Sequence, residues 1–271
     1  MDQRITTVCI GFVSLFVIYI IYRYIFKGNK NDHLLINVVR DAWKSKIIKY
    51  KKIKKATSDS EYTYSFWMYI DDWSYLLKKP KCVMFKGDVN GKRCNPSIWL
   101  YPYSNKLMVR VETYQSDVVN PNLYPENNTN MNPLKNPDML TPPNKNGVQY
   151  VCDVPNMPLQ RWIHVGVSLS NRTLDVYING KLARSGILQG IPKMNKGNLY
   201  VTQYGGYDGY ISCLQVFENA ISANEMYNIY TGGPSGCKGW FKSNYFDKYR
   251  LKASIGKVGN LEDEQSISIK L

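Results

Sequence analysis

The chain has 271 residues, so once an anchor and a stem are set aside it can hold one domain with a single hydrophobic core. It contains 22 tyrosines, and because aromatic residues fit a pleated sheet better than a helix, this composition favours an all-β body. The formal charge is +14, but residues 1–56 hold 12 Lys and Arg against three Asp, so the remaining residues carry a net charge of only +5. Because the excess charge lies in the N-terminal segment, we do not expect nucleic acid as a partner.

An uncharged apolar run occupies residues 5–22 and continues past Arg23 to residue 26. At about 1.5 Å per residue, a helix of this length crosses a hydrocarbon core of about 30 Å, so we expect a transmembrane anchor at residues 1–26. A secretory signal peptide is the alternative, but it has a shorter apolar region and a small-residue cleavage site. The residues expected in the bilayer are Ile5, Ile10, Phe12, Leu15, Phe16, Ile18, Ile20, Ile21 and Tyr22.

The charges beside the apolar run predict its orientation. Only Arg4 precedes the run, whereas five Lys or Arg residues lie between positions 23 and 44. Because basic residues near the ends of a span resist translocation, we expect a single-pass membrane protein whose main domain faces the cytosol. The glycosylation sequons at Asn127 and Asn171 would be used only in a lumenal domain.

A basic stem is expected at residues 27–57, and such a strip is attracted to the anionic headgroups of a lipid membrane. Its candidate lysines are Lys27, Lys30, Lys44, Lys46, Lys49, Lys51 and Lys52. Apolar residues recur through it at helical spacing: Ile36, Val39, Trp43, Ile47 and Tyr50. The stripe predicts a partly helical stem that lies on the membrane surface or docks on a partner, and a plain basic spacer is the equal alternative.

Apolar and polar residues alternate with period two between residues 58 and 232, which predicts short strands. The expected strands cover 62–70, 82–85, 97–101, 107–113, 162–169, 174–178, 199–203 and 210–217. Asn179 and Gly180 predict a type I′ turn, because both central residues of that turn need a positive φ. A short helix over 222–230 is expected to begin at a Ser222 cap, with Glu225 completing a capping box.

Two segments lack this alternation. Residues 115–150 hold six of the 13 prolines, which argues against a central strand and predicts a long loop, the first place to look for a partner contact. Residues 233–271 form a basic and aromatic tail that is expected to pack on the domain or on a neighbour.

The cysteines and histidines argue against a metal site. Five cysteines lie outside the expected membrane span without a CxxC pair, and the chain has only two histidines, so the spacing of a zinc site is missing. Cys82 and Cys94 flank an expected hairpin, so a disulfide between them is possible in an oxidising setting, but buried free thiols are the favoured interpretation. His164, on an expected strand without a nucleophile or carboxylate constellation beside it, is interpreted as structural.

Three stretches together resemble the concanavalin A-like (laminin G-like) jelly-roll superfamily. They are Tyr64–Ile70, Trp162–Leu182 and Gly206–Met226 with Tyr230 following, and their order and spacing match over residues 58–232. The resemblance implies an all-β, antiparallel β-sandwich with loops clustered on one edge.

The superfamily includes glucanases, which need two carboxylates placed on one strand face. No expected strand carries a Glu-x-Asp-x-x-Glu pattern, so we expect no enzymatic activity and no cofactor. Glycan binding by a lectin-like site is an alternative, with exposed aromatics for stacking and loop carboxylates for hydroxyls or calcium. The candidate ligand loop contains Tyr204, Tyr207 and Asp208.

The leading hypothesis combines anchor, stem and sandwich. Similar anchored concanavalin A-like proteins occur in large DNA viruses, where a capsid is built on the cytosolic side of a membrane. The resemblance and the lysine-, asparagine- and tyrosine-rich composition therefore favour a structural or interaction protein of the virion membrane, or a minor capsid component, that bridges a membrane to a protein shell.

Overall fold

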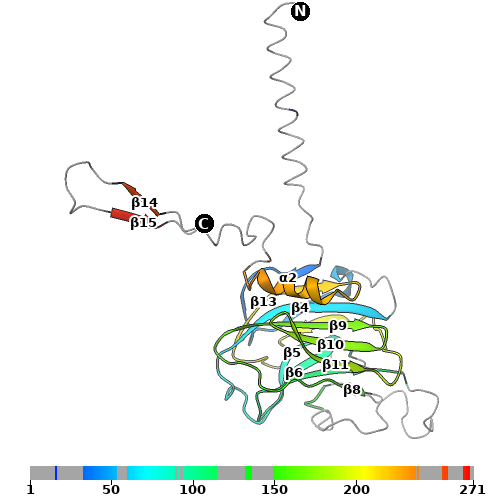
Figure 1. The fold of residues 1–271 in the computed structure, drawn as a ribbon. Helices are drawn as coiled ribbons and strands as arrows, with labels where there is room; N and C mark the ends of the chain where they lie inside the picture. The colour runs from blue at the N-terminus through cyan, green and yellow to red at the C-terminus, as the bar shows by residue number, and fades with distance from the viewer. Residues whose placement is uncertain are drawn as a thin grey trace, which may run out of the picture. The chain divides into compact units, whose positions relative to one another are not determined.

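The computed structural model divides the chain into two compact units, residues 33–237 and residues 1–32 with 238–271. The described residues are 16, 33–53, 60–88, 91, 94–114, 132–135, 149–235, 237, 252–255 and 265–268. The first unit contains two antiparallel sheets (Figure 1). In the second, β14 (Lys252–Ile255) pairs with β15 (Gln265–Ser268) as an antiparallel hairpin.

The expected membrane anchor, Lys27 and Lys30 of the stem, and nearly all of the expected loop at 115–150 lie outside the described residues. Of the anchor residues only Phe16 is described, and it is helical. Within the described ranges, no helix is both long and apolar enough to cross a bilayer.

The first sheet, sheet A, has the strand order β1-β13-β4-β9-β10-β11, with β2 paired to β13. Its strands are β1 (Leu34–Ile36), β2 (Arg40–Asp41), β4 (Glu61–Ile70), β9 (Trp162–Ser170), β10 (Thr173–Ile178), β11 (Lys181–Ile187) and β13 (Gly209–Phe217). The turn between β10 and β11 confirms its prediction, because Asn179 and Gly180 have φ of 50° and 73°.

The second sheet, sheet B, has the order β3-β12-β5-β6-β7-β8. Its strands are β3 (Lys46–Ile48), β5 (Lys81–Gly87), β6 (Ser97–Leu100), β7 (Leu107–Glu112), β8 (Gln149–Val151) and β12 (Asn198–Val201). The eight expected strands are therefore present, and the predicted sandwich is confirmed. β8 shortens the expected loop, because it pairs with β7.

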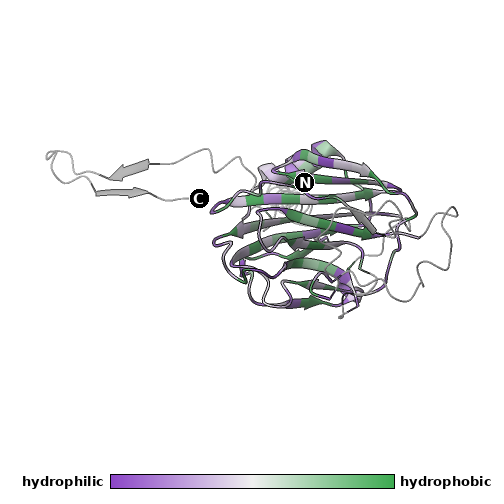
Figure 2. Ribbon diagram, turned by 90° about the horizontal axis from the view of Figure 1, so that it is seen from below, coloured by the Kyte–Doolittle hydropathy of each residue, from purple (hydrophilic) through white to green (hydrophobic). Residues whose placement is uncertain are grey.

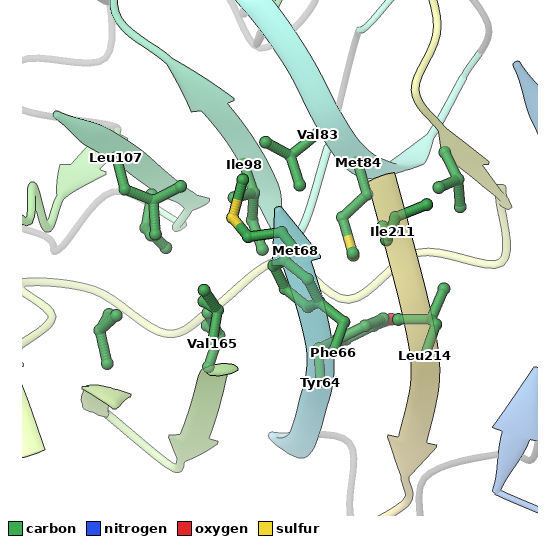
Figure 3. Packing of buried hydrophobic residues seen from close by; sticks show 14 of the residues in the cluster. Tyr64, Phe66, Met68, Val83, Met84, Ile98, Leu107, Val165, Ile211 and Leu214 are labelled. Atoms are coloured by element: carbon green, nitrogen blue, oxygen red, sulfur yellow. The ribbon is translucent and has the colours of Figure 1, made fainter. Parts of the chain in front are cut away.

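The main core lies between the two sheets. Figure 3 shows Phe66 and Met68 of β4 directed toward Met84 and Ile98 of sheet B, and all four are fully buried. Figure 2 shows hydrophobic and hydrophilic residues alternating along many strands, as a two-faced sheet requires. All residues of the hydrophobic clusters lie between Leu34 and Cys237, so this unit carries its own core and can fold without the rest of the chain.

Helix α2 (Ala223–Thr231) covers the outer face of sheet A. Its predicted capping box is confirmed: the Ser222 hydroxyl accepts from the Glu225 amide, and the Glu225 carboxylate accepts from the Ser222 amide. Met226 packs so closely on Gly166 that a Cβ there would lie 2.4 Å from the methionine sulfur. The helix explains why both faces of β4 and β9 are buried.

The predicted helical stem is wrong for residues 33–53. This segment forms β1, β2 and β3 and a single 3-10 turn, η1 (Tyr50–Lys52), and its strands pair with β13 and β12. Ile36 and Ile48 are buried in the main core, whereas Trp43 and Ile47 are exposed, so the apparent helical stripe faces two environments. Because the backbone of residues 33–53 pairs with strands of both sheets, the domain begins near residue 33 and not at 58.

Cys82 and Cys94 do not form the possible disulfide, and the favoured interpretation of buried free thiols is confirmed for both. Both thiols are free and buried, as is that of Cys152, and the disulfide joins Cys213 of β13 to Cys237, with Cα atoms 5.6 Å apart. Cys237 packs with Trp67 in a cluster on the outer face of sheet A. The domain therefore extends five residues beyond its expected end at 232.

Candidate functional site

The loop that follows β12 holds the three sequence-predicted ligand residues. Tyr207 is fully buried, and its hydroxyl donates to the Tyr210 carbonyl at 2.9 Å, so it belongs to the core and the prediction is wrong for it. The Asp208 carbonyl accepts from the Asp71 amide at 3.0 Å, which places this residue in a backbone turn. Only Tyr204, with 43% of its surface exposed, has a ring that a ligand can reach.

Tyr204 belongs to an aromatic cluster on the outer face of sheet B, formed with Phe85, Trp99 and Tyr200. Successive strand residues point to opposite faces, so the cluster residues lie opposite the core side chains of β5, β6 and β12. The Phe85 ring stacks on those of Tyr200, Tyr204 and Trp99 at centroid distances of 5.0, 6.3 and 6.1 Å. The result is a stacked aromatic cluster in which only Tyr204 is exposed.

A shallow cleft of about 410 Å³ adjoins this cluster where β5 and β12 meet. It is lined by Gly87, Asp88, Asn195, Lys196, Gly197, Asn198 and Tyr200. Gly87 and Gly197 touch backbone to backbone, because a Cβ on Gly197 would lie 2.2 Å from the Gly87 carbonyl oxygen. Only glycine fits at position 197, and its lack of a side chain keeps the cleft open.

Hydrogen bonds hold the walls of the cleft in place. The Asn195 amide group donates to the Lys86 carbonyl at 3.0 Å, and the Lys86 ammonium donates to the Asn195 carbonyl at 2.7 Å. The Asn195 side-chain oxygen accepts from the Gly197 amide, and that of Asn198 accepts from the Tyr50 amide, both at 3.0 Å. These amides fix the loop geometry before any ligand binds.

The charges at the cleft have opposite signs. Asp88 and Lys196 are exposed, while burial of Lys86 lowers the pKa of its ammonium to about 8. The cleft therefore presents a carboxylate and an ammonium group side by side to a polar ligand.

The other half of the outer face of sheet B contains paired ions. Arg110 is fully buried and donates to the Asp153 carboxylate and, at 3.1 Å, to the Tyr101 hydroxyl. The Glu112 carboxylate accepts from the Lys193 ammonium at 3.2 Å. Both carboxylates thus bind a cation of the protein, as expected for groups that stabilise a buried surface.

His164 is buried beneath α2, where its Nε2 atom lies 2.8 Å from the Ser65 hydroxyl. Burial lowers the pKa of this imidazole to about 4, so it is neutral at physiological pH. A Ser–His pair can activate a nucleophile, but a pair with no exposed surface cannot meet a substrate, which supports the structural interpretation. Within the described residues no group of three or more His, Cys, Asp or Glu side chains could hold a metal ion.

The cleft residues were not predicted from the sequence. They come from a strand end and a turn about a hundred residues apart, so no single stretch contains them. The available signal is local: Asn195, Lys196 and Gly197 form a turn-forming run directly before an expected strand.

Residues 97–226 match the family model described as the concanavalin A-like lectin/glucanases superfamily. Together with the two-sheet topology, this match supports a concanavalin A-like fold. Comparison with curated proteins gave no match.

Three similar solved structures are binding domains of botulinum neurotoxins. The serotype D domain is 10% identical with a TM-score of 0.46, over 75% of this chain and 52% of that chain. The DC domain in complex with SialylT is 13% identical with a TM-score of 0.42, over 64% of this chain and 35% of that chain. The serotype G domain is 10% identical with a TM-score of 0.43, over 64% of this chain and 36% of that chain. This chain thus spans about a third to a half of those chains.

Proposed function

We propose that the protein is a membrane-held binding protein with a lectin-like sandwich, and that its cleft between β5 and β12 binds a glycan. The observation that carries the proposal is the cleft itself, in which Tyr200 adjoins the exposed groups Asp88 and Lys196. The match to a superfamily that includes lectins supports it. The membrane attachment rests on the uncharged run at residues 5–22 of the sequence.

Each part of the cleft has a role in this proposal. The Asp88 carboxylate accepts hydrogen bonds from the hydroxyls of a sugar. Tyr200 is buried and contributes only to the apolar lining beside it. Lys196 supplies a positive charge that favours an acidic sugar. Tyr204, the exposed member of the aromatic cluster, provides a stacking position for a longer glycan.

The proposal is of binding without catalysis. A glycosidase needs two carboxyl groups, one protonated and one ionised, on either side of the bond to be cleaved. The two carboxylates next to the aromatic half of sheet B, Glu112 and Asp153, are each paired with a cation of the protein. Both carboxylates are therefore engaged in contacts within the protein.

A glycan array probed with residues 33–237 tests the proposal. We expect the wild type to bind a defined set of glycans, and Asp88→Ala to weaken binding about tenfold or more, because a hydrogen bond to a charged group is lost. Tyr204→Ala should weaken binding of longer glycans only. Tyr103→Ala is the matched control, since Tyr103 is exposed but outside the cleft. An array without signal, or an equal loss in the control, would contradict the proposal.

A second candidate is the structural role, in which the protein bridges a membrane to the protein shell of a virion. The observation that favours it is the edge strand β11, whose residues are largely exposed, including Leu182 and Ile187. An exposed edge offers unpaired backbone groups to a strand of a partner. Crosslinking of native particles followed by mass spectrometry should then link Lys181 to a shell protein, and purified particles without this protein would refute the role.

A further inference from the structure

The structure assigns a second binding surface to the sandwich: we propose that residues 37–52, here called the basic platform, dock directly on an anionic lipid bilayer. This inference goes beyond the glycan cleft and is independent of it. It concerns the folded domain, and it requires no contribution from the apolar run at residues 5–22.

Bulky apolar side chains are exposed along the platform. Trp43 and Ile47 have 50% and 55% of their surfaces exposed, and Val38 and Val39 are similarly exposed. Single exposed apolar residues are normal on a protein surface, but here four occur within ten positions of one segment. Tryptophan and branched aliphatic side chains are those that enter the headgroup region of a membrane.

Positive charge surrounds these side chains. Between residues 37 and 52 there are six Lys or Arg residues and one acidic residue, Asp41, which is already paired with Lys44 at 2.6 Å. Burial lowers the pKa of Lys46, and the charges of Arg40 and Lys52 lower it further. The platform therefore complements a negatively charged surface.

The rest of the domain holds the platform in a fixed conformation. The Ala42 amide donates to the Gly209 carbonyl at 2.9 Å, and the Thr202 hydroxyl donates to the Lys44 carbonyl at 2.8 Å. Ala42 is fully buried. Because the backbone is already ordered, docking on a membrane would order few groups and would cost little conformational entropy.

A lipid surface fits these groups better than an acidic protein or a nucleic acid. Nucleic acid binding uses cations with polar and aromatic side chains, and it gives no role to exposed valine and isoleucine. A bilayer uses both features, since its headgroups attract the lysines and its acyl boundary accepts Trp43 and Ile47. In the anchored protein, residues 27–32 would extend at most about 20 Å, so the platform would stay near the bilayer.

Vesicle flotation of residues 33–237 tests the inference without the apolar run. Vesicles of phosphatidylcholine, with and without phosphatidylserine and free of glycolipid, are mixed with the domain and centrifuged. We expect the domain to float only with phosphatidylserine present. Lys46→Ala with Lys49→Ala should weaken binding roughly 25-fold, about fivefold for each charge near the surface. Trp43→Ser with Ile47→Ser should also weaken binding.

The matched control is Leu182→Ser, because Leu182 is exposed to the same 55% as Ile47 but lies on β11, the edge strand of sheet A opposite β1. It should float like the wild type. Thermal unfolding of each variant shows that the fold is retained. Equal binding to uncharged vesicles, no flotation, or an equal loss in the control would overturn the inference. So would binding to heparin or DNA by a domain that ignores vesicles. Each of these results is independent of glycan binding at the cleft.

Discussion

The Cys213–Cys237 disulfide closes a loop that contains α2, with a sequence separation of 24 residues. A crosslink stabilises a fold mainly because it lowers the entropy of the unfolded chain, and a loop of this length gives about 3.5 kcal/mol at 25 °C. Replacing both cysteines with alanine should therefore lower the free energy of unfolding of residues 33–237 by about this amount. For a domain of this size, the corresponding fall in Tm is about 7–14 °C.

Urea denaturation followed by circular dichroism measures the effect. The oxidised wild type, the wild type in dithiothreitol and the double variant are compared, and the last two should coincide. Cys152→Ala is the control, because Cys152 is a free buried thiol whose replacement adds no sensitivity to reductant. Alkylation of the unfolded, unreduced domain should label three thiols. Five labelled thiols, or unchanged stability in reductant, would refute the reasoning.

The disulfide also bears on which side of a membrane the domain is expected to face. Disulfides persist in oxidising compartments and are rare in the cytosol, whereas the basic flank of the apolar run predicts a cytosolic domain. Because Cys213 and Cys237 are buried, cells are denatured directly in an alkylating agent, which traps whichever thiols are reduced at that moment. Labelling of both is the result expected for a domain kept in the reducing cytosol, and protection of both indicates an oxidising compartment.

Three further changes test the packing, each followed by urea denaturation. His164 has a pKa of about 4 in the folded protein and near 6.5 in the unfolded chain, so the unfolded chain binds more protons between these pH values. The free energy of unfolding should therefore fall by up to about 3 kcal/mol as the pH is lowered from 6.5 to 4. In His164→Gln this fall should be smaller. Ser222→Ala removes the cap of α2 and should cost about 1 kcal/mol. Phe66→Ala empties a fully buried site and should cost about 3–5 kcal/mol, and a smaller loss would mean that the core between the sheets collapses around it.

The strands of the sandwich could be predicted because their physical signal is local. In β4, Tyr64, Phe66 and Met68 face the main core, and this alternation is visible in the sequence. The turn at Asn179 and the cap of α2 likewise depend on a few adjacent residues. The stem could not be predicted, because β1 and β3 have three residues each and are too short to show a period of two.

The candidate site could not be predicted for a different reason. Asp88 and Asn195 become neighbours only through the pairing of β5 with β12, and a sequence contains no direct record of such pairing. Tyr204 and Tyr207 are equivalent by composition, but the turn between them directs one ring outward and buries the other. The disulfide partner of Cys213 depends in the same way on where α2 returns to sheet A.

Mapping of a bound glycan by nuclear magnetic resonance tests the central claim most directly. The backbone amides of residues 33–237 are followed while a glycan identified on the array is added to saturation. The proposed site predicts that the largest shift changes occur at Gly87 and Asp88 and at 195–198, with smaller changes at Tyr204. Changes centred on β11 or on the basic platform, or no change at saturation, would contradict it.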